Sequence, residues 1–387
     1  MAKKQAYVRL SGDFTYLGEY GSPESHATYQ RVVAEWLSRG RTPRPDEASG
    51  DGPSVNEVLL AYWKWAETYY VDAEGKPGRE MQSIAYAIKP LKELYGNTSA
   101  LLFGPVALKA VRQQMIDLGL CRGVINQRVG CIKRIFKWAV SEELVNTSVH
   151  HGLSAVDGLR RGHTMARETA KVRPVPDAYV DAVLPMLAPT VKSMVEVQRL
   201  TGMRSGELVL LRTCDVDTTG KVWRYRPARH KTANRGHERV VHIGPRAQDI
   251  LKPLLRPDEP EAYVFSPLRA QVERNAAKRA ARKTKVQPSQ ICRAKPKPRK
   301  RVGECYCTRS YYRAVLYGIK AAVNAGALVE NVGWHPHQLR HNYGTRIRRE
   351  RGLDAARALM GHRTLSQADE YAELDTATAS RVAHELG

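Results

Sequence analysis

Apolar residues recur at helical spacing through most of residues 54–150. Ser54 is followed three positions later by Glu57, the pattern of a capping box, in which each side chain satisfies a backbone N–H of the other at a helix start. Apolar positions three and four residues apart then mark one face of each segment. The pattern predicts a helical domain over 54–150, with helices at about residues 54–70, 79–95, 105–118 and 122–142.

The helix predicted at 122–142 has two faces of opposite character. Apolar residues such as Ile125, Ile132 and Phe136 line the face that is expected to pack in a core. A basic face opposite a core face suits a helix that lies on DNA phosphates, although a solvated surface gives the same pattern. The basic side chains are Arg128, Lys133, Arg134 and Lys137.

Residues 1–45 show a smaller pattern of two strands and a helix. Alternating apolar and polar residues predict strands at 6–10 and 14–17, and Ser-Pro-Glu begins a helix over 22–37. A linker rich in Pro and Gly follows at 41–54. The unit is either an extension without a separate role or an accessory DNA-binding module.

The rest of the chain predicts a third domain over 177–387. Helical periodicity is interrupted by a β-rich stretch at 222–244 and by an intensely basic insertion at 268–305. The charge density of the insertion favours phosphate contact over a solvated loop. The whole pattern predicts a mostly α protein with a small β-sheet and hairpin component, an α+β fold. Its C-terminal helices are expected at about 177–187, 190–202, 246–254, 309–325, 337–351, 353–360, 366–373 and 376–386.

The charge balance narrows the class of partner. Lys and Arg number 62 against 39 Asp and Glu, a formal net charge of +23 with an isoelectric point of about 9.9. Such a field attracts a polyanion, and nucleic acid is favoured over an anionic membrane surface. No apolar run approaches the ~20 residues that span a bilayer, and the N-terminus lacks the apolar stretch of a signal peptide. A cytoplasmic, nucleoid-associated protein is expected.

The six cysteines are too few and too scattered for a disulfide framework. Cys292, Cys305 and Cys307 lie in one basic stretch, but their spacing matches no zinc motif and no histidine is close in sequence. Reduced thiols are expected, and no metal.

Two segments of the C-terminal domain carry charged groups that are candidates for a site. Arg204 and Glu207 stand three positions apart at the start of a predicted helix, so they share a face. Lys231 lies near the tip of the predicted hairpin. Each feature alone has an ordinary explanation. Arg204 and Glu207 could form a surface ion pair, and Lys231 could be a solvated lysine.

Two later segments add groups that suit an anion and a nucleophile. His337 and Arg340 also stand three apart on one predicted helix. Gly361 ends a helix and turns the chain at His362, and Tyr371 lies on the next predicted helix. A single tyrosine on a helix is usually a core residue, so only the combination is informative.

Taken in order, the T-G-x-R-x-x-E, H-x-L-R-H and L-x-G-H segments, with a tyrosine nine residues after the last histidine, resemble the catalytic domain of the tyrosine recombinases, the phage-integrase family. The resemblance covers about residues 190–375. Residues 54–150 resemble the helical core-binding domain of that family, and residues 1–45 loosely resemble its arm-binding domain. The basic insertion at 268–305 departs from the compact family pattern and leaves the DNA footprint of the domain open.

The resemblance implies transesterification at a DNA phosphodiester, with no metal, cofactor or ATP. Tyr371 is then the nucleophile, which forms a 3′-phosphotyrosyl link and leaves a free 5′-hydroxyl. The other implied roles are Arg204 and Arg340 as donors to the phosphate oxygens, Lys231 as general acid, His337 as base or positioning residue, His362 as a phosphate donor and Glu207 as the residue that orients Arg204.

The resemblance also implies double-stranded DNA as the partner and a homotetramer on two paired sites, with room for accessory DNA-bending or directionality factors. Integration or excision of a phage or mobile element is favoured over resolution of chromosome dimers, because an arm-binding unit suits an integrase. Three alternatives stay open, of which a purely structural basic protein is the least favoured. A type IB topoisomerase uses similar chemistry without pairing two sites, and a DNA-binding regulator can carry an inactive catalytic domain.

Overall fold

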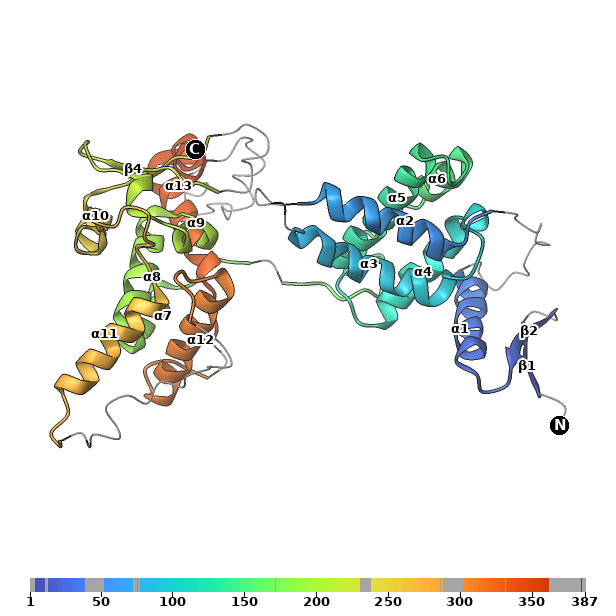
Figure 1. Cartoon of the computed structure of the whole chain (residues 1–387), viewed down its shortest axis with the longest axis horizontal. Coiled ribbons are helices and arrows are strands. Elements are labelled where there is room, and N and C mark those ends of the chain that lie inside the picture. Colours follow the sequence, from blue (N-terminus) through green and yellow to red (C-terminus); the bar gives the residue numbers. More distant parts are fainter. Residues whose placement is uncertain are drawn as a thin grey trace. The chain divides into compact units, whose positions relative to one another are not determined.

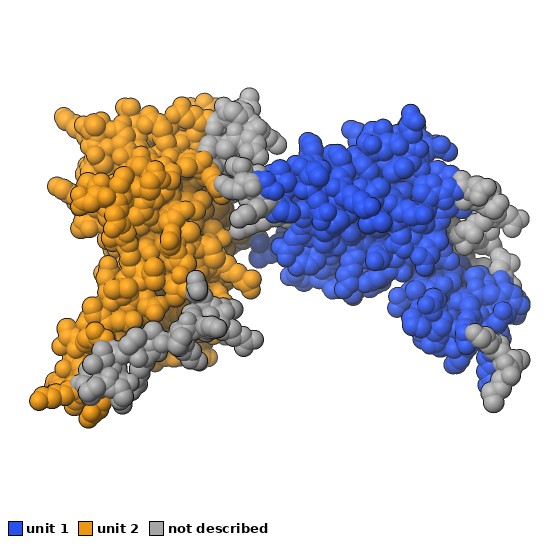
Figure 2. All heavy atoms as spheres, in the orientation of Figure 1, with its two compact units in different colours: residues 1–170 blue, residues 171–387 orange. Residues whose placement is uncertain are grey.

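A computed structural model describes the chain at residues 4–10, 13–38, 52–71, 75, 77–170, 172–229, 238–285, 287, 302–330, 332–361 and 384. The chain forms two compact units, residues 1–170 and 171–387 (Figure 2). Each unit has its own apolar core. The predicted fold class, mostly helical with small antiparallel sheets, is confirmed (Figure 1).

The N-terminal part of unit 1 is a hairpin followed by a helix, as predicted. Strands β1 (Gln5–Leu10) and β2 (Asp13–Glu19) pair antiparallel, and α1 (Pro23–Ser38) follows. The outward face of the hairpin carries exposed aromatic rings. The Arg9 guanidinium lies 5.1 Å from the ring centre of Phe14, and Tyr7 and Tyr16 are also exposed.

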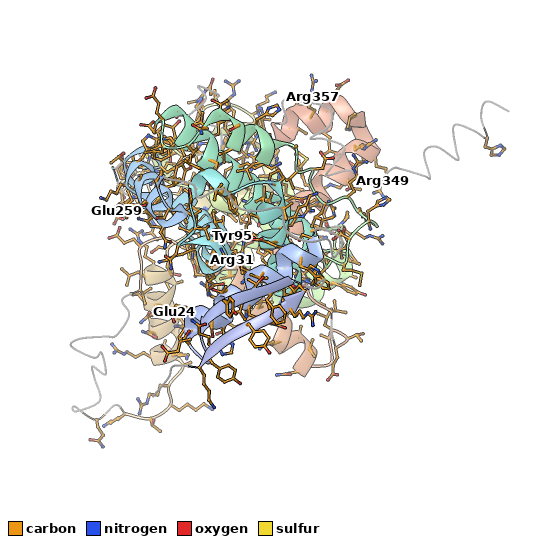
Figure 3. The ribbon with its side chains drawn as sticks, turned by 90° about the vertical axis from the view of Figure 1, so that its right-hand side faces the viewer. Glu24, Arg31, Tyr95, Glu259, Arg349 and Arg357 are labelled. Carbon is orange, nitrogen blue, oxygen red and sulfur yellow. The ribbon has the colours of Figure 1, made fainter. Side chains whose placement is uncertain are left out.

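Helix α1 is attached to the helical part of unit 1. The Tyr95 hydroxyl donates a 2.6 Å hydrogen bond to Glu35 Oε1 of α1, and both side chains are buried. Arg31 of α1 and Tyr95 also line one cavity of about 220 Å³ (Figure 3). Much of the linker predicted at 41–54 lies outside the described residues, but α1 packs against α4 (Pro105–Asp117) in the same compact unit.

The predicted helices of residues 54–150 are present almost residue for residue. The capping box at Ser54 and Glu57 is formed in both directions. The sequence did not predict one short helix, α6 (Thr147–Ser154). This helix has eight residues and buries only Val149 and Leu153, so its apolar pattern is too short to recognise. The other helices here are α2 (Val55–Tyr69), α3 (Arg79–Tyr95), α4 and α5 (Arg122–Ser141).

Unit 2 combines helices with a three-stranded antiparallel sheet in the order β3-β4-β5. The strands β4 and β5 flank the segment that contains Lys231, so the two sides of the predicted hairpin pair as expected. The elements are α7 (Asp177–Val183), α8 (Pro189–Thr201), α9 (Ser205–Val209), β3 (Val216–Asp217), β4 (Trp223–Tyr225), β5 (Val241–Ile243), α10 (Pro245–Leu251), α11 (Pro267–Ala280), α12 (Thr308–Asn324) and α13 (Pro336–Met360).

Helix α13 contains the two helices predicted at 337–351 and 353–360. Gly352 separates them with φ of 85° and ψ of 175°, so the chain changes direction there. Gly361 then ends α13 in the left-handed conformation, with φ of 63°. The helix predicted at 366–373 falls outside the described residues, and so does the helix predicted at 376–386 apart from residue 384. Within the described part of the chain, no helix is long and apolar enough to cross a membrane.

Candidate active site

The structure describes three of the six predicted catalytic residues. Arg204 precedes α9, and His337 and Arg340 lie on the first turns of α13. The sites predicted at Lys231, His362 and Tyr371 lie outside the described residues.

A left-handed turn at Gly202 places Arg204. Gly202 ends α8 with φ of 63°, and a Cβ atom there would lie 2.3 Å from the Tyr343 ring. Only glycine satisfies both the backbone conformation and the space. The turn puts Arg204 at the residue before α9, with 31% of its side chain exposed. A guanidinium at that position can reach a ligand from solvent while its inner side is held by the protein.

Glu207 holds the inner side of Arg204. Arg204 Nη1 donates to Glu207 Oε1 at 2.8 Å, and the Arg204 backbone N–H donates to Glu207 Oε2 at 2.9 Å. Only 3% of the Glu207 side chain is exposed. Burial alone would raise the pKa of Glu207, but the charges of Arg239 and Arg204 and the hydrogen bonds from Arg204 outweigh it and hold that pKa below its usual value. These contacts hold Arg204 against Glu207, and the role of Glu207 in catalysis stays a prediction.

Arg239 is a second partner of Glu207 that was not predicted from the sequence. Arg239 Nε donates to Glu207 Oε1 at 3.3 Å and its Nη1 donates to the Val240 carbonyl at 3.1 Å. The side chain is 6% exposed and lies against Gly361, where a Cβ atom would be 2.4 Å from Arg239 Nη1. Arg239 therefore contacts both Glu207, the partner of Arg204, and Gly361, the residue before His362.

A sequence signal for Arg239 exists. Arg239 alternates with Val241 and Ile243, and all three point inward and are buried. A buried charged residue that continues the inward alternation of β5, as Arg239 does two residues before the strand begins, needs a buried partner of opposite charge, and Glu207 is that partner.

Arg340 is fully enclosed. Its Nη1 donates to the Gly202 carbonyl at 2.7 Å and its Nη2 donates to the Met360 carbonyl at 2.8 Å. The side chain thus joins the end of α8 to the end of α13. Contact between Arg340 and a phosphate stays a prediction, and it requires that the guanidinium exchange a carbonyl for a phosphate oxygen or turn an edge toward the ligand.

Three imidazoles gather at the start of α13. The rings of His335 and His337 lie nearly parallel with centres 6.5 Å apart, and the His341 ring meets His337 edge-on at 5.3 Å. Burial lowers the pKa of His337, and the charges of Arg340 and Arg204 lower it further. His337 is therefore a neutral imidazole near pH 7, able to accept a proton or a hydrogen bond.

The basic residues predicted on α5 divide into two groups. Lys133 Nζ contacts the Val156 carbonyl, and Arg134 donates to Glu80 at 2.7 Å. The Arg128 guanidinium lies 5.5 Å from the ring centre of Tyr86, and Lys137 is exposed. DNA contact by these four residues stays a prediction. Lys137 and the Arg128–Tyr86 pair are the best placed for it, because Lys133 and Arg134 have partners within unit 1.

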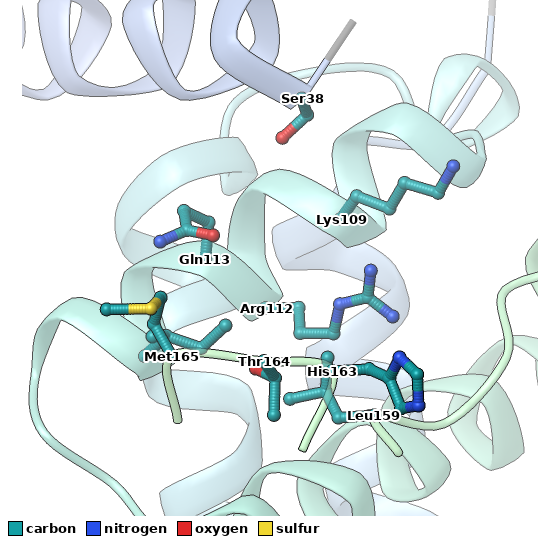
Figure 4. A pocket seen from close by; sticks show the side chains of 9 residues that line it. Ser38, Lys109, Arg112, Gln113, Leu159, His163, Thr164 and Met165 are labelled. Atoms are coloured by element: carbon teal, nitrogen blue, oxygen red, sulfur yellow. The ribbon is translucent and has the colours of Figure 1, made fainter. Parts of the chain in front are cut away.

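A cavity of about 290 Å³ lies in unit 1, between α4 and the segment after α6 (Figure 4). Lys109, Arg112 and His163 line it, but Arg112 Nη1 already donates to the Asp157 carbonyl at 2.9 Å. The cavity contains none of the predicted catalytic residues, so it is not the candidate active site. Among the residues that the structure describes, no cluster of His, Cys, Asp and Glu is arranged to hold a metal ion.

Solved structures of two integrases share the architecture of this chain. A lambda integrase dimer bound to a COC′ core site has a TM-score of 0.57 at 14% identity, over 95% of this chain and 92% of that chain. A lambda integrase tetramer bound to a Holliday junction gives 0.58 at 14% identity, over 95% and 94%. The Tn1549 transposon integrase in complex with transposon right end DNA gives 0.59 at 13% identity, over 86% and 99%.

The chain has the fold of these integrases. Neither a protein-family model nor a curated protein sequence matches the chain. At identities of 12–16%, the likeness to the integrases establishes the fold, and the chemistry must be argued from the residues themselves.

Replacement of Arg239 tests whether Glu207 needs its second partner. Arg239→Met leaves the buried Glu207 carboxylate with Arg204 alone, and breaking a buried pair typically costs about 3–5 kcal/mol. The matched control is Arg226→Met, which breaks an exposed Arg–Glu pair between Arg226 and Glu238 (51% and 73% exposed) and should cost under about 1 kcal/mol. Urea unfolding measures both. Equal losses in the two variants would show that the buried pair contributes nothing special.

Acid should destabilise unit 2 through His341. Burial and the neighbouring charges of His337, His335 and Arg340 lower the pKa of His341 to about 4 from 6.5. The unfolded chain therefore binds this proton first as the pH falls, so stability is complete above about pH 6.5 and is lost toward pH 4, by up to about 1.4 kcal/mol per pH unit. Urea unfolding at about pH 7.5 and about pH 5 measures how far the free energy of unfolding falls in acid. This decrease should be smaller in His341→Gln than in the unmodified chain.

The control for this effect is His151→Gln, which removes an exposed histidine of unit 1. That variant should keep the acid loss of the unmodified chain. If the free energy of unfolding fell as much in His341→Gln as in His151→Gln, His341 would not be the group that causes the acid destabilisation.

Proposed function

We propose that the chain is a site-specific DNA recombinase of the integrase type, which cleaves and rejoins DNA strands through a 3′-phosphotyrosyl intermediate. The observation that carries the proposal is the convergence of Arg204, Arg340 and His337 in unit 2. Arg340 binds the carbonyl of Gly202, two residues before Arg204, and both arginine charges act on the His337 ring. Two guanidinium groups beside a neutral imidazole suit a phosphodiester in transesterification.

The reaction conserves the number of phosphate ester bonds, because each one that breaks is replaced by a new one. The Tyr371 hydroxyl attacks the phosphorus atom, a phosphorus–oxygen bond to Tyr371 forms, and the bond to the 5′-oxygen breaks. The free phenol has a pKa of ~10 and must lose its proton to react, and the neutral His337 ring is the group assigned to accept or position it. Attack by a 5′-hydroxyl on the phosphotyrosine reverses these steps, so rejoining consumes no ATP.

The arginines are assigned to stabilise the five-coordinate transition state, in which negative charge grows on the non-bridging oxygens. Arg340 does so once its guanidinium exchanges a carbonyl for a phosphate oxygen or turns an edge toward the ligand. Arg204 is ready for this role, because Glu207 holds one edge of its guanidinium and leaves the other edge toward solvent. Lys231 protonates the departing 5′-oxygen as general acid, and His362 donates to the phosphate. The contact of Arg239 with Gly361 supports the chain immediately before His362.

DNA is the substrate, and unit 1 supplies further contacts to it. Lys137 and Arg128 of α5 are assigned to the core site, and the hairpin of residues 1–45 to a second, arm-type site. We expect a homotetramer on two paired sites. The structures of lambda integrase as a dimer on a core site and as a tetramer on a Holliday junction support both expectations by analogy of fold. Integration or excision of a mobile element is the favoured purpose, with the Tn1549 transposon integrase as the second structural parallel.

Replacement of the nucleophile is the decisive test. Tyr371→Phe removes the attacking oxygen, so the variant should bind DNA normally and form no covalent adduct. The substrate is a set of end-labelled duplexes that tile the DNA on both sides of the gene, and adducts are detected as bands that survive SDS. Tyr317→Phe is the matched control, because Tyr317 is an exposed tyrosine of α12, and it should form adducts at the normal rate.

Adducts formed by Tyr371→Phe would refute the assignment of the nucleophile. Plasmid relaxation by a monomer without sequence preference would favour the type IB topoisomerase, and sequence-specific binding without any adduct in the unmodified chain would favour the inactive regulator.

A charge-conserving change tests the arginine fork. Arg204→Lys keeps the positive charge but loses the paired donors, so the cleavage rate should fall by about 100-fold or more while DNA affinity changes little. Arg199→Lys is the control, since Arg199 pairs with Asp181 on the surface of the same region. Single-turnover cleavage measures both rates. A rate for Arg204→Lys within a few-fold of the control would contradict the role of Arg204.

A further inference from the structure

Helix α11 is a helix without a core face. Its first turn is fixed to unit 2, since Ser266 is buried and caps Arg269 N–H, and Arg269 pairs with Glu259. Beyond that turn every residue from 272 to 285 is exposed, and no residue of α11 is buried. Figure 1 shows α11 extending away from the other helices of unit 2.

Packing in unit 2 does not explain this helix. Helices shorter than about 12–15 residues are marginal in water, and most helices in proteins are stabilised by a buried apolar face. Helix α11 has 14 residues and lacks such a face. Its sequence compensates in part with strong helix formers, the alanines and arginines, and with cations at the C-terminal end of the helix dipole.

The charges of the exposed part are almost all of one sign. Residues 272–285 contain six Lys and Arg and one Glu. Arg274 and Lys278 stand one turn apart, where like charges repel along a helix. Nearby cations therefore weaken the free helix, and a polyanion would remove that repulsion.

We propose that α11 and the residues directly after it form a DNA-binding arm, which contacts the phosphate backbone of duplex DNA through Lys278, Arg282 and Lys283. Lys278 lies in the last turn of α11, Arg282 and Lys283 follow the helix, and all three are exposed. The inference rests on the proposed function only in taking DNA as the partner, and it adds a contact surface separate from Arg204 and from α5.

The composition of α11 distinguishes DNA from a membrane surface. A helix that lies in a lipid interface needs an apolar face with large side chains. The exposed large apolar residues of α11 are Leu268 and Val272, both near its fixed end. Phosphates of duplex DNA require only cations at intervals along the contact, and α11 provides them.

The test compares two triple variants with the same change in net charge. Lys278→Gln/Arg282→Gln/Lys283→Gln alters the arm, and Lys192→Gln/Arg246→Gln/Lys252→Gln alters three exposed cations elsewhere in unit 2. The probe is a duplex of about 40 base pairs of random sequence, and equilibrium binding is measured from about 50 to about 200 mM salt. Each lost phosphate contact lowers the slope of log affinity against log salt by about 0.9. The arm variant should lose about 2.7 in slope, and the control should keep the slope of the unmodified chain.

A slope for the arm variant equal to that of the control would overturn the proposal. Amide hydrogen exchange of residues 272–281 provides a second readout, and the same duplex should slow it. Exchange slowed by anionic vesicles but not by the duplex would also overturn the proposal. Because no strand is cut in either measurement, the result is independent of the Tyr371 adduct assay.

Discussion

The site in unit 2 depends on one buried carboxylate. Glu207 is nearly inaccessible to solvent and faces two guanidinium groups, Arg204 and Arg239. A buried charge is tolerated only with close partners of opposite sign. One carboxylate and two arginines together carry a net charge of about +1. Because Arg204 is the exposed member of the three, this positive charge is accessible to a ligand there. The arrangement fixes the direction of a side chain that would otherwise move freely, and it keeps the local field attractive to an anion.

Arg340 adds a second constraint of a different kind. Its two carbonyl partners, Gly202 and Met360, lie 138 and 20 positions away in sequence. One side chain therefore holds together three separate points of the chain. The same arginine helps to keep the neighbouring imidazoles neutral. Structural support and the electrostatics of the site therefore come from the same group, and its replacement would affect both together.

Much of the fold follows from local pattern, and the parts that do not follow depend on distant partners. Ser54 and Glu57 predict their helix start because the capping interaction spans three residues. The pairing of Arg204 with Glu207 is equally local. Arg239 was not predicted because its partner lies 32 positions away, and the enclosure of Arg340 depends on a turn at Gly202 whose space is set by Tyr343. The roles of Lys231, His362 and Tyr371 rest on the sequence motifs alone, and the catalytic roles of Arg204, His337 and Arg340 also stay predictions.

The attachment of α1 to Tyr95 has a geometric consequence. A hairpin on a free tether could explore any position within reach of its linker, whereas the buried bond between Glu35 and Tyr95 makes the hairpin part of the helical body. The outward rings of the hairpin and the basic side chains of α5 therefore belong to the same compact unit. A ligand that binds both surfaces at once contacts a single compact unit, not two bodies joined by a free tether.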